Sequence, residues 1–154
     1  MYLVMTRSLY ILMMKQQNKL RSILFVLGGI LMVIGVGCFV FMFKQQIVSW
    51  LFLVGTVLFA TMQMMQGYEG NNITIRRLKN IMNLADMVFI FSGILMVDNV
   101  YGFIRPAFSN PMDYLNYLYN KWVVLLLIAA IMEIYTMHRI EWEIKKENKN
   151  NSNI

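Results

Sequence analysis

Apolar residues dominate four stretches of the chain, and polar segments separate these stretches from one another. They cover residues 22–43, 47–66, 84–105 and 121–138. A helix needs about 20 mainly apolar residues to cross the hydrocarbon core of a bilayer. The pattern therefore predicts an all-α integral membrane protein with four transmembrane helices.

The connections between the predicted helices indicate how they follow one another. Residues 44–46 form a tight turn between the first two helices, and residues 67–82 form a polar and then basic loop. Residues 106–120 contain two prolines and three tyrosines, which suits a segment at the membrane interface. Helices joined in this way are expected to form two tandem antiparallel hairpins.

The third predicted helix resembles the first one. Residues 84–105 match residues 20–40 at nine positions with an offset of 64, and the run Gly-Ile-Leu-Met-Val is shared. Trp50 and Trp122 each open the second helix of a hairpin. One interpretation is a parallel duplication of one hairpin, with both copies in the same membrane orientation. The alternative is chance similarity between two apolar helices of similar composition.

A short segment is expected on each side of the four-helix domain, which covers residues 15–147. Residues 1–14 are apolar but include Arg7, and they are too few to cross a bilayer. They are expected to lie at the membrane surface, or to precede a translation start at Met14. Residues 148–154 are rich in asparagine and are predicted to be disordered.

Basic residues are distributed unevenly over the polar segments. Eleven of the 14 lysines and arginines lie before the first helix, between the second and third, or after the fourth. The other three are Lys44, Arg105 and Lys121. Because short cytoplasmic loops are enriched in basic residues, both termini are expected in the cytoplasm. We therefore predict a multi-pass protein of the plasma membrane, which in a bacterium is the inner membrane.

The composition narrows the possible functions. Hydrophobic residues make up 58% of the chain and charged residues 14%, which is typical of a membrane protein. The formal net charge of +6 is explained by orientation in the bilayer, so no nucleic-acid partner is expected. One cysteine, Cys38, and one histidine, His138, are too few ligands for a zinc site or a bis-histidine haem. We predict no metal and no cofactor.

Four glycines in the first predicted helix form a candidate helix-packing face. Gly28 and Gly35 are seven residues apart and lie on one face, with Gly29 and Gly37 close to it. Small residues allow a neighbouring helix to approach closely in a membrane, where packing drives association. The alternative is a scatter of lipid-exposed glycines.

An ionisable residue inside a membrane helix costs free energy, so each such residue requires a structural or functional explanation. The candidate intramembrane polar cluster consists of Asp86, Asp98, Asn99, Arg105, Lys121 and Glu133. A rise of about 1.5 Å per residue places Asp98 and Lys121 at the same depth, so they are expected to meet across the last two helices. By the same estimate Asp86 and Glu133 lie at one depth, near the cytoplasmic side.

Two interpretations of these acidic residues remain open. In the first, Asp86 and Glu133 share a proton and belong, with Asp98, to a proton or cation path. In the second, Asp98 and Lys121 hold two helices together, and the other two carboxylates reach the lipid headgroups beside basic residues. Neither interpretation places a nucleophile beside a base, so no catalytic residue is predicted and no enzyme is expected.

Two segments carry a resemblance to known proteins. The basic and then apolar residues 76–97, and residues 121–146 with their charged end, resemble small uncharacterised four-helix inner-membrane proteins of bacteria. The resemblance implies a plasma-membrane protein and supplies no activity. Small multidrug transporters also have four helices, but they depend on an acidic residue in the first helix, and residues 22–43 contain none.

Two functions follow from these features as hypotheses. The first is a noncatalytic structural or interaction module, or an accessory subunit, that binds a second copy or a larger membrane-protein partner. It would use the glycine face and the basic loop. The second is a small proton- or cation-coupled transporter that uses the acidic residues of the second hairpin. In both, the lipid bilayer is the immediate surrounding partner.

Overall fold

The computed structural model describes residues 2–67 and 72–151, and the described part is helical throughout, without a β-strand. Four of its helical stretches are long and apolar enough to cross a membrane, which confirms the predicted all-α class and the number of membrane-length helices. The elements are α1 (Tyr2–Val40), α2 (Gln45–Met64), α3 (Ile73–Tyr101), the 3-10 turn η1 (Arg105–Ala107), α4 (Pro111–Tyr117) and α5 (Trp122–Asn151).

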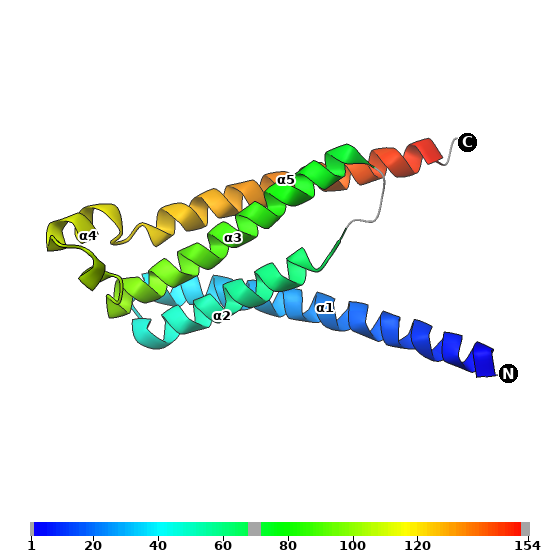
Figure 1. Ribbon diagram of the computed structural model, residues 1–154, viewed down its shortest axis with the longest axis horizontal. Coiled ribbons are helices and arrows are strands. Elements are labelled where there is room, and N and C mark those ends of the chain that lie inside the picture. Colours follow the sequence, from blue (N-terminus) through cyan, green and yellow to red (C-terminus); the bar gives the residue numbers. More distant parts are fainter. Residues whose placement is uncertain (1, 68–71, 152–154) are drawn as a thin grey trace.

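The long helices lie side by side in an elongated arrangement (Figure 1). Helix α1 packs on α2, α2 packs on α3, and α3 packs on α5. The start of α1, the end of α2, the start of α3 and the end of α5 point to one end of the molecule, here called the terminal end. Helix α4 lies at the opposite end, here called the α4 end.

Helix α1 differs from its predicted bounds at both ends. The sequence predicts a helix over residues 22–43, whereas α1 begins at Tyr2 and ends at Val40. The polar residues 15–21 include no glycine or proline and are mostly good helix formers, so they continue the helix outside an apolar span. Helix α1 stops before the turn, in which Met42 and Lys44 adopt positive φ angles of 56° and 38°.

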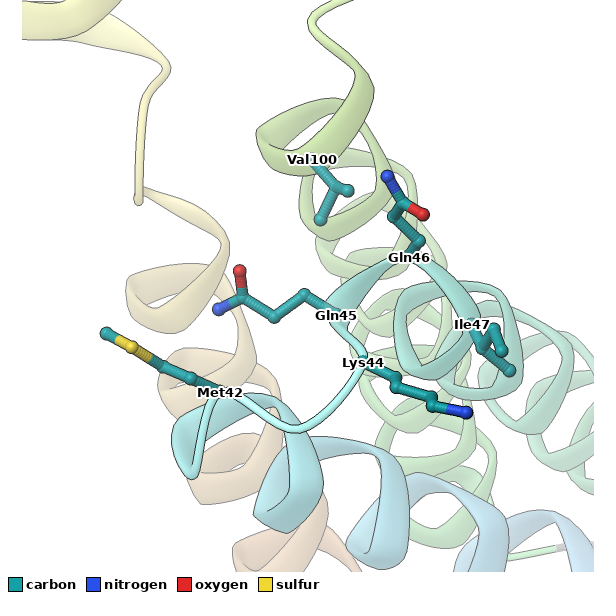
Figure 2. Close-up of a pocket in the computed structure, with 6 residues that line it drawn as sticks. All are labelled: Met42, Lys44, Gln45, Gln46, Ile47 and Val100. Atoms are coloured by element: carbon teal, nitrogen blue, oxygen red, sulfur yellow. The ribbon is translucent and has the colours of Figure 1, made fainter.

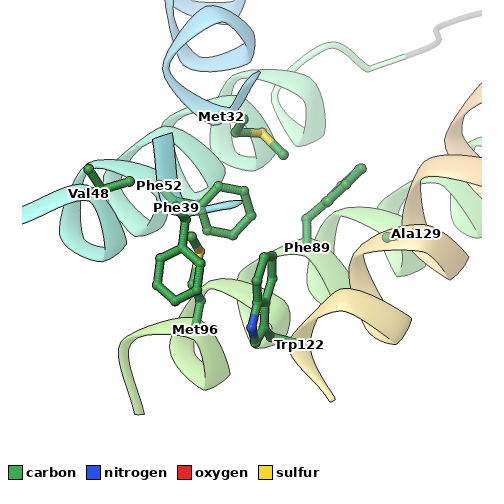
Figure 3. Close-up of a cluster of buried hydrophobic side chains, with 8 residues drawn as sticks. All are labelled: Met32, Phe39, Val48, Phe52, Phe89, Met96, Trp122 and Ala129. Carbon is green, nitrogen blue, oxygen red and sulfur yellow. The ribbon is translucent and has the colours of Figure 1, made fainter. Parts of the chain in front are cut away.

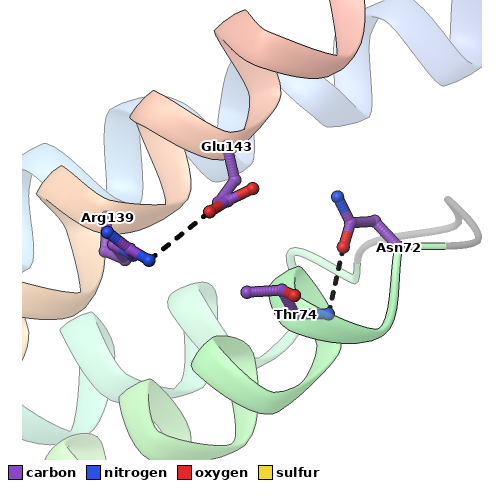
Figure 4. Close-up of polar contacts among 4 residues, drawn as sticks. All are labelled: Asn72, Thr74, Arg139 and Glu143. Carbon is purple, nitrogen blue, oxygen red and sulfur yellow. Dashed lines mark hydrogen bonds and ion pairs between the residues drawn. The ribbon is translucent and has the colours of Figure 1, made fainter.

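Helix α3 also begins earlier than predicted, at Ile73 instead of residue 84. The side-chain oxygen of Asn72 accepts a hydrogen bond of 3.0 Å from the backbone N–H of Thr74 (Figure 4). Asparagine is among the preferred residues at this N-cap position, because its side chain satisfies a free N–H of the first turn. Most of the predicted loop is therefore helix, and it carries the basic residues on a rigid element.

Helix α5 continues beyond the predicted residue 138 as far as Asn151. Ion pairs between residues four apart support the charged extension: Arg139 with Glu143 at 3.6 Å (Figure 4) and Lys145 with Glu141 at 2.6 Å. The prediction of disorder from residue 148 is therefore wrong for residues 148–151. Residues 152–154 lie outside the described part of the chain.

Glycines determine how closely α1 approaches α2. A Cβ atom added at Gly28 would lie 2.8 Å from the backbone nitrogen of Phe59, and one at Gly35 would lie 2.8 Å from the Cβ of Phe52. Gly55 contributes from α2, since a Cβ there would lie 3.0 Å from the backbone nitrogen of Met32. The face with Gly28 and Gly35 is thus filled by a helix of the same chain.

The other two glycines of the predicted packing face are placed differently. A Cβ at Gly29 would make ordinary contacts with the ring of Phe59 at 3.7 Å. At Gly37 an added Cβ would meet nothing within 4 Å. The close approach of α1 to α2 therefore depends on two of the four predicted glycines.

The main hydrophobic core joins all four long helices (Figure 3). Trp122, at the start of α5, packs edge-on against Phe39 of α1 at 5.0 Å and Phe52 of α2 at 6.4 Å between ring centroids. Trp122 is buried, whereas Trp50, at the start of α2, is half exposed. The core consists of Met32, Phe39, Val48, Phe52, Phe89, Met96, Trp122 and Ala129.

Candidate functional site

The six residues of the predicted polar cluster do not form one site. Asp98, Asn99, Arg105 and Lys121 lie toward the α4 end, near the end of α3 and the start of α5. Asp86 and Glu133 lie closer to the terminal end, in the middle parts of α3 and α5. The structure therefore divides the predicted cluster into two groups with different surroundings.

Asp98 fastens the connection after α3 to the end of that helix. Its Oδ1 accepts a hydrogen bond of 2.7 Å from the backbone N–H of Ile104, and its Oδ2 accepts one of 2.8 Å from the hydroxyl of Tyr114. Both Asp98 and Tyr114 are buried. Hydrogen bonds to a charged acceptor are stronger than neutral ones, so this carboxylate holds α4 against α3.

The predicted pairing of Asp98 with Lys121 is wrong. Among the described residues no ion pair joins them; the carboxylate is bonded to Ile104 and Tyr114 instead, and Lys121 is exposed. Asn99 makes the connection between the two helices, since its Oδ1 accepts a hydrogen bond of 3.1 Å from the backbone N–H of Asn120. The ammonium group of an exposed lysine stays hydrated, so an ion pair between Lys121 and the buried Asp98 would add little stability.

Three polar side chains from three helices form a second, deeply buried group, here called the carboxylate cluster. Gln63 of α2 is 2% exposed, Asp86 of α3 is 0% exposed, and Glu133 of α5 is 6% exposed. The side-chain nitrogen of Gln63 donates a hydrogen bond to Oε1 of Glu133. Asp86 and Glu133 are close enough for their charges to interact.

Helix α3 brings this cluster together because it packs on both α2 and α5. Gly93 allows the close approach to α2, since a Cβ there would lie 2.9 Å from both Leu53 and Thr56. On the other side of α3, the hydroxyl of Ser92 donates a hydrogen bond of 2.8 Å to the backbone oxygen of Trp122 in α5. These contacts fix the positions of α2 and α5 against α3, and with them the depths of Gln63, Asp86 and Glu133.

Several oxygen atoms of the cluster are buried without a hydrogen-bond partner among the described residues. They are both carboxyl oxygens of Asp86, Oε2 of Glu133 and Oε1 of Gln63. A buried polar group without a partner is costly, and a buried charge without one is more so. Hydrogen bonds that hold helices together therefore do not explain the burial of Asp86 and Glu133, whereas they do explain the burial of Asp98.

The surroundings also argue against contact with lipid headgroups. Asp86 is fully enclosed, and Arg139 pairs with Glu143 of its own helix. The nearby cation is Lys79, which is partly buried at the start of α3 and whose charge acts on both Asp86 and Glu133. The interpretation in which the two carboxylates reach the surface is therefore wrong.

The arrangement limits the chemistry of the cluster. In the part of the chain that the structure describes, no three His, Cys, Asp or Glu side chains are grouped as metal ligands would be. Neighbouring carboxyl groups can instead share a proton, and an amide can orient one of them by donating a hydrogen bond. The cluster is suited to reversible binding of a proton.

A cavity of about 560 Å³ lies at the α4 end and is separate from this cluster (Figure 2). Its lining comes from the turn between α1 and α2, from the first residues of α2 and from one residue of α3. Lys44 is the charged group of that lining, which contains no carboxylate. The lining residues are Met42, Lys44, Gln45, Gln46, Ile47 and Val100.

Sequence reasoning missed two residues that matter in these groups. Gln63 lies near the end of an apolar helix, where a polar residue suggests a boundary, although an isolated amide within such a stretch also signals a buried polar contact. Tyr114 belongs to a run of tyrosines that predicts an interfacial segment. Its hydrogen bond to Asp98 depends on the turn after α3, which no sequence pattern specifies.

Known proteins give no second indication of what the carboxylate cluster does. Comparisons with protein-family models, curated proteins and solved structures found no match to this chain. The assignment of a function therefore rests on the geometry around Gln63, Asp86 and Glu133.

Proposed function

We propose that this chain is a small multi-pass membrane carrier that couples transport to proton binding at the carboxylate cluster. The observation that carries the proposal is the complete burial of Asp86 with both carboxyl oxygens unpartnered among the described residues. A central aspartate costs about 2.5–3.5 kcal/mol on insertion scales. A carboxylate kept at that cost inside a membrane helix is by default a functional group.

The orientation in the bilayer is part of this proposal. Eleven of the 14 basic residues lie in segments that project to the terminal end or lead to it, and three lie toward the α4 end. The positive-inside rule then favours a cytoplasmic terminal end, with both termini inside and the protein in the plasma membrane. The carboxylate cluster would lie nearer the cytoplasmic face.

A parallel duplication is also proposed for the two halves. At the offset of 64 residues, Gly28 and Gly35 correspond to Ser92 and Asn99. The two glycines face α2. Ser92 bonds to Trp122 at the start of α5 and Asn99 bonds to Asn120, two residues before that start, so in each half the corresponding face of the first helix packs toward the second helix. The acidic second half would then have acquired the proton-binding function.

In the proposed cycle a proton binds a carboxyl group of the cluster and is later released to the other side. Gln63 holds Glu133 through its amide N–H, and Oε2 of Glu133 has no hydrogen-bond partner among the described residues. Asp86 is the nearby group that can exchange the proton with it. With the proton bound, the buried cluster carries less charge, and the energetic barrier to moving α3 against α2 and α5 falls.

Infrared spectroscopy of the protein in lipid tests proton binding at this cluster. On titration from acid to alkaline pH, the wild type should lose carbonyl absorption of protonated carboxyl groups. Asp86→Asn and Glu133→Gln keep the side-chain shape but cannot ionise, so each should remove part of that change. Asp113→Asn, at an exposed residue of α4, shows how much of the change one carboxyl group outside the cluster contributes. Identical pH-dependent spectra in the wild type, Asp86→Asn and Glu133→Gln would refute proton binding by the cluster.

A second function, an interaction module, is favoured by the first half of α1. This part extends beyond α2 at the terminal end (Figure 1). Many of its apolar side chains are exposed. Those exposed in residues 4–13 are Val4, Met5, Leu9, Ile11, Leu12 and Met13. An extended apolar helix face of this kind suits a membrane-protein partner or a second copy in the bilayer.

Truncation tests this second function. A chain that starts at Met14 should lose a partner or a second copy, seen as a smaller particle mass after gentle extraction. The four-helix domain should stay folded, because the described side chains of residues 4–9 and 11–13 are exposed. Deletion of residues 148–154 is the control. An unchanged particle mass after the N-terminal truncation would exclude an interaction through this segment.

A further inference from the structure

A polar stripe on α3 leads from the terminal end to the carboxylate cluster. Arg76, Lys79, Asn83 and Asp86 follow one another at spacings of three, four and three residues. Residues at these spacings lie on one face of a helix. The stripe changes from basic at the terminal end to amide and then to acidic inside the molecule.

The basic part of the stripe faces a small cavity between the end of α2 and the start of α3. This cavity has a volume of about 160 Å³. Among the residues that the structure describes, it brings together two cationic side chains and three side-chain amides, and no carboxylate. The lining residues are Met64, Gln66, Gly67, Arg76, Lys79, Asn80 and Asn83.

We propose that this cavity binds a phosphate group, supplied either by a lipid headgroup or by a small soluble phosphate. Arginine presents a fork of N–H donors that matches phosphate oxygens, and lysine adds a compact positive charge. The amides of Gln66, Asn80 and Asn83 supply neutral N–H donors. Basic pockets between membrane helices on the cytoplasmic side are known to favour such headgroups.

Lys79 is shared between this cavity and the carboxylate cluster. It also lines a second cavity of about 580 Å³ between α3 and α5, and its charge acts on both Asp86 and Glu133. When the carboxyl groups of Asp86 and Glu133 are ionised, they attract the ammonium group of Lys79. When a proton reduces their negative charge, the ammonium group becomes available to the phosphate. Among the described residues, the charged or titratable groups around Lys79 are Arg76 and Asp86 on α3 and Glu133, His138 and Glu141 on α5, and Gln66, just after α2, contributes an amide.

Binding of a proton and binding of the phosphate group should therefore reinforce each other. This coupling rests on the proposed proton-binding function, whereas the phosphate site itself does not. The carrier would then move a phosphate-bearing anion together with a proton, or its activity would depend on an anionic lipid held at the cavity.

Thiol protection tests the site. Met64→Cys places a reporter in the cavity lining, in a Cys38→Ser background that removes the native thiol. The protein is placed in phosphatidylcholine nanodiscs, and the rate of labelling by neutral N-ethylmaleimide is measured with and without inorganic phosphate, at matched ionic strength. Phosphate should slow labelling several-fold.

The variants separate the site from general effects of charge. Arg76→Gln and Lys79→Gln should abolish the protection. Arg77→Gln removes the same charge from the neighbouring exposed residue, which does not line the cavity, and should retain it. Protection that is absent in the reporter protein, or equal in all three variants, would overturn the phosphate site.

Two further arms identify the source of the phosphate and test the coupling. If nanodiscs with phosphatidylglycerol already slow labelling and free phosphate adds little, the ligand is the lipid headgroup; equal protection by free phosphate in both lipids supports a soluble anion.

Asp86→Asn should increase protection at neutral pH, because it releases Lys79. Unchanged protection in Asp86→Asn would overturn the sharing of Lys79. Loss of the proposed proton binding would appear instead in the infrared titration, with phosphate protection intact.

Discussion

Replacing Gly35 with leucine is expected to destabilise the protein strongly, because α2 occupies the space that the side chain needs. Even a single Cβ atom would lie 2.8 Å from the Cβ of Phe52 and 3.0 Å from its Cα. Overpacking of a closed core costs about 1–3 kcal/mol, and the involvement of backbone atoms places this change at or above the upper value. Unfolding in mixed micelles of increasing sodium dodecyl sulfate, followed by tryptophan fluorescence, measures the free-energy difference.

Gly37→Leu is the matched control for this prediction. The added side chain would meet nothing within 4 Å of its Cβ, so stability should be unchanged or slightly higher, as glycine costs about 1 kcal/mol relative to alanine in a helix. If Gly35→Leu does not fold, Gly35→Ala gives a smaller loss at the same contact. Equal stabilities of the Gly35 and Gly37 variants would contradict the observed packing of α1 on α2.

The apolar runs were sufficient to predict four membrane-length helices, because a continuous apolar stretch has few alternatives. They did not predict where α3 begins and where α5 ends, since both helices extend through charged residues there. Arg76 and Lys79 were assigned to a loop for this reason. Their helical placement, capped by Asn72, is what aligns them with Asp86 on one face.

Residue counting gave the depth of the acidic residues but not their directions. Asp86 and Glu133 were expected at one depth, and their charges do interact in the structure. Asp98 and Lys121 were placed at one depth by the same count, yet Asp98 bonds to Tyr114 and Lys121 stays exposed. Depth follows from the rise per residue, whereas contact also depends on the turn geometry and on rotation about the helix axis.

Loss of proton transport in Asp86→Asn is the second large effect that we expect. The substitution keeps the volume of the side chain but leaves a group that can neither bind nor release a proton in the physiological range. Because Glu133 would then lack the neighbour with which it exchanges a proton, transport should fall to the background of protein-free vesicles. Glu133→Gln should have the same consequence, and Asp113→Asn on the exposed face of α4 should not.

The most direct test of a proton-coupled carrier is therefore flux through reconstituted vesicles. Vesicles with a trapped pH-sensitive dye and equal concentrations of potassium phosphate inside and outside receive an external acid pulse, with valinomycin present to hold the membrane potential at zero. The account predicts fast internal acidification with the wild type and with Asp113→Asn, and background rates with Asp86→Asn and Glu133→Gln. Equal acidification rates for the wild type and the folded Asp86→Asn and Glu133→Gln variants would contradict a transport role for the carboxylate cluster.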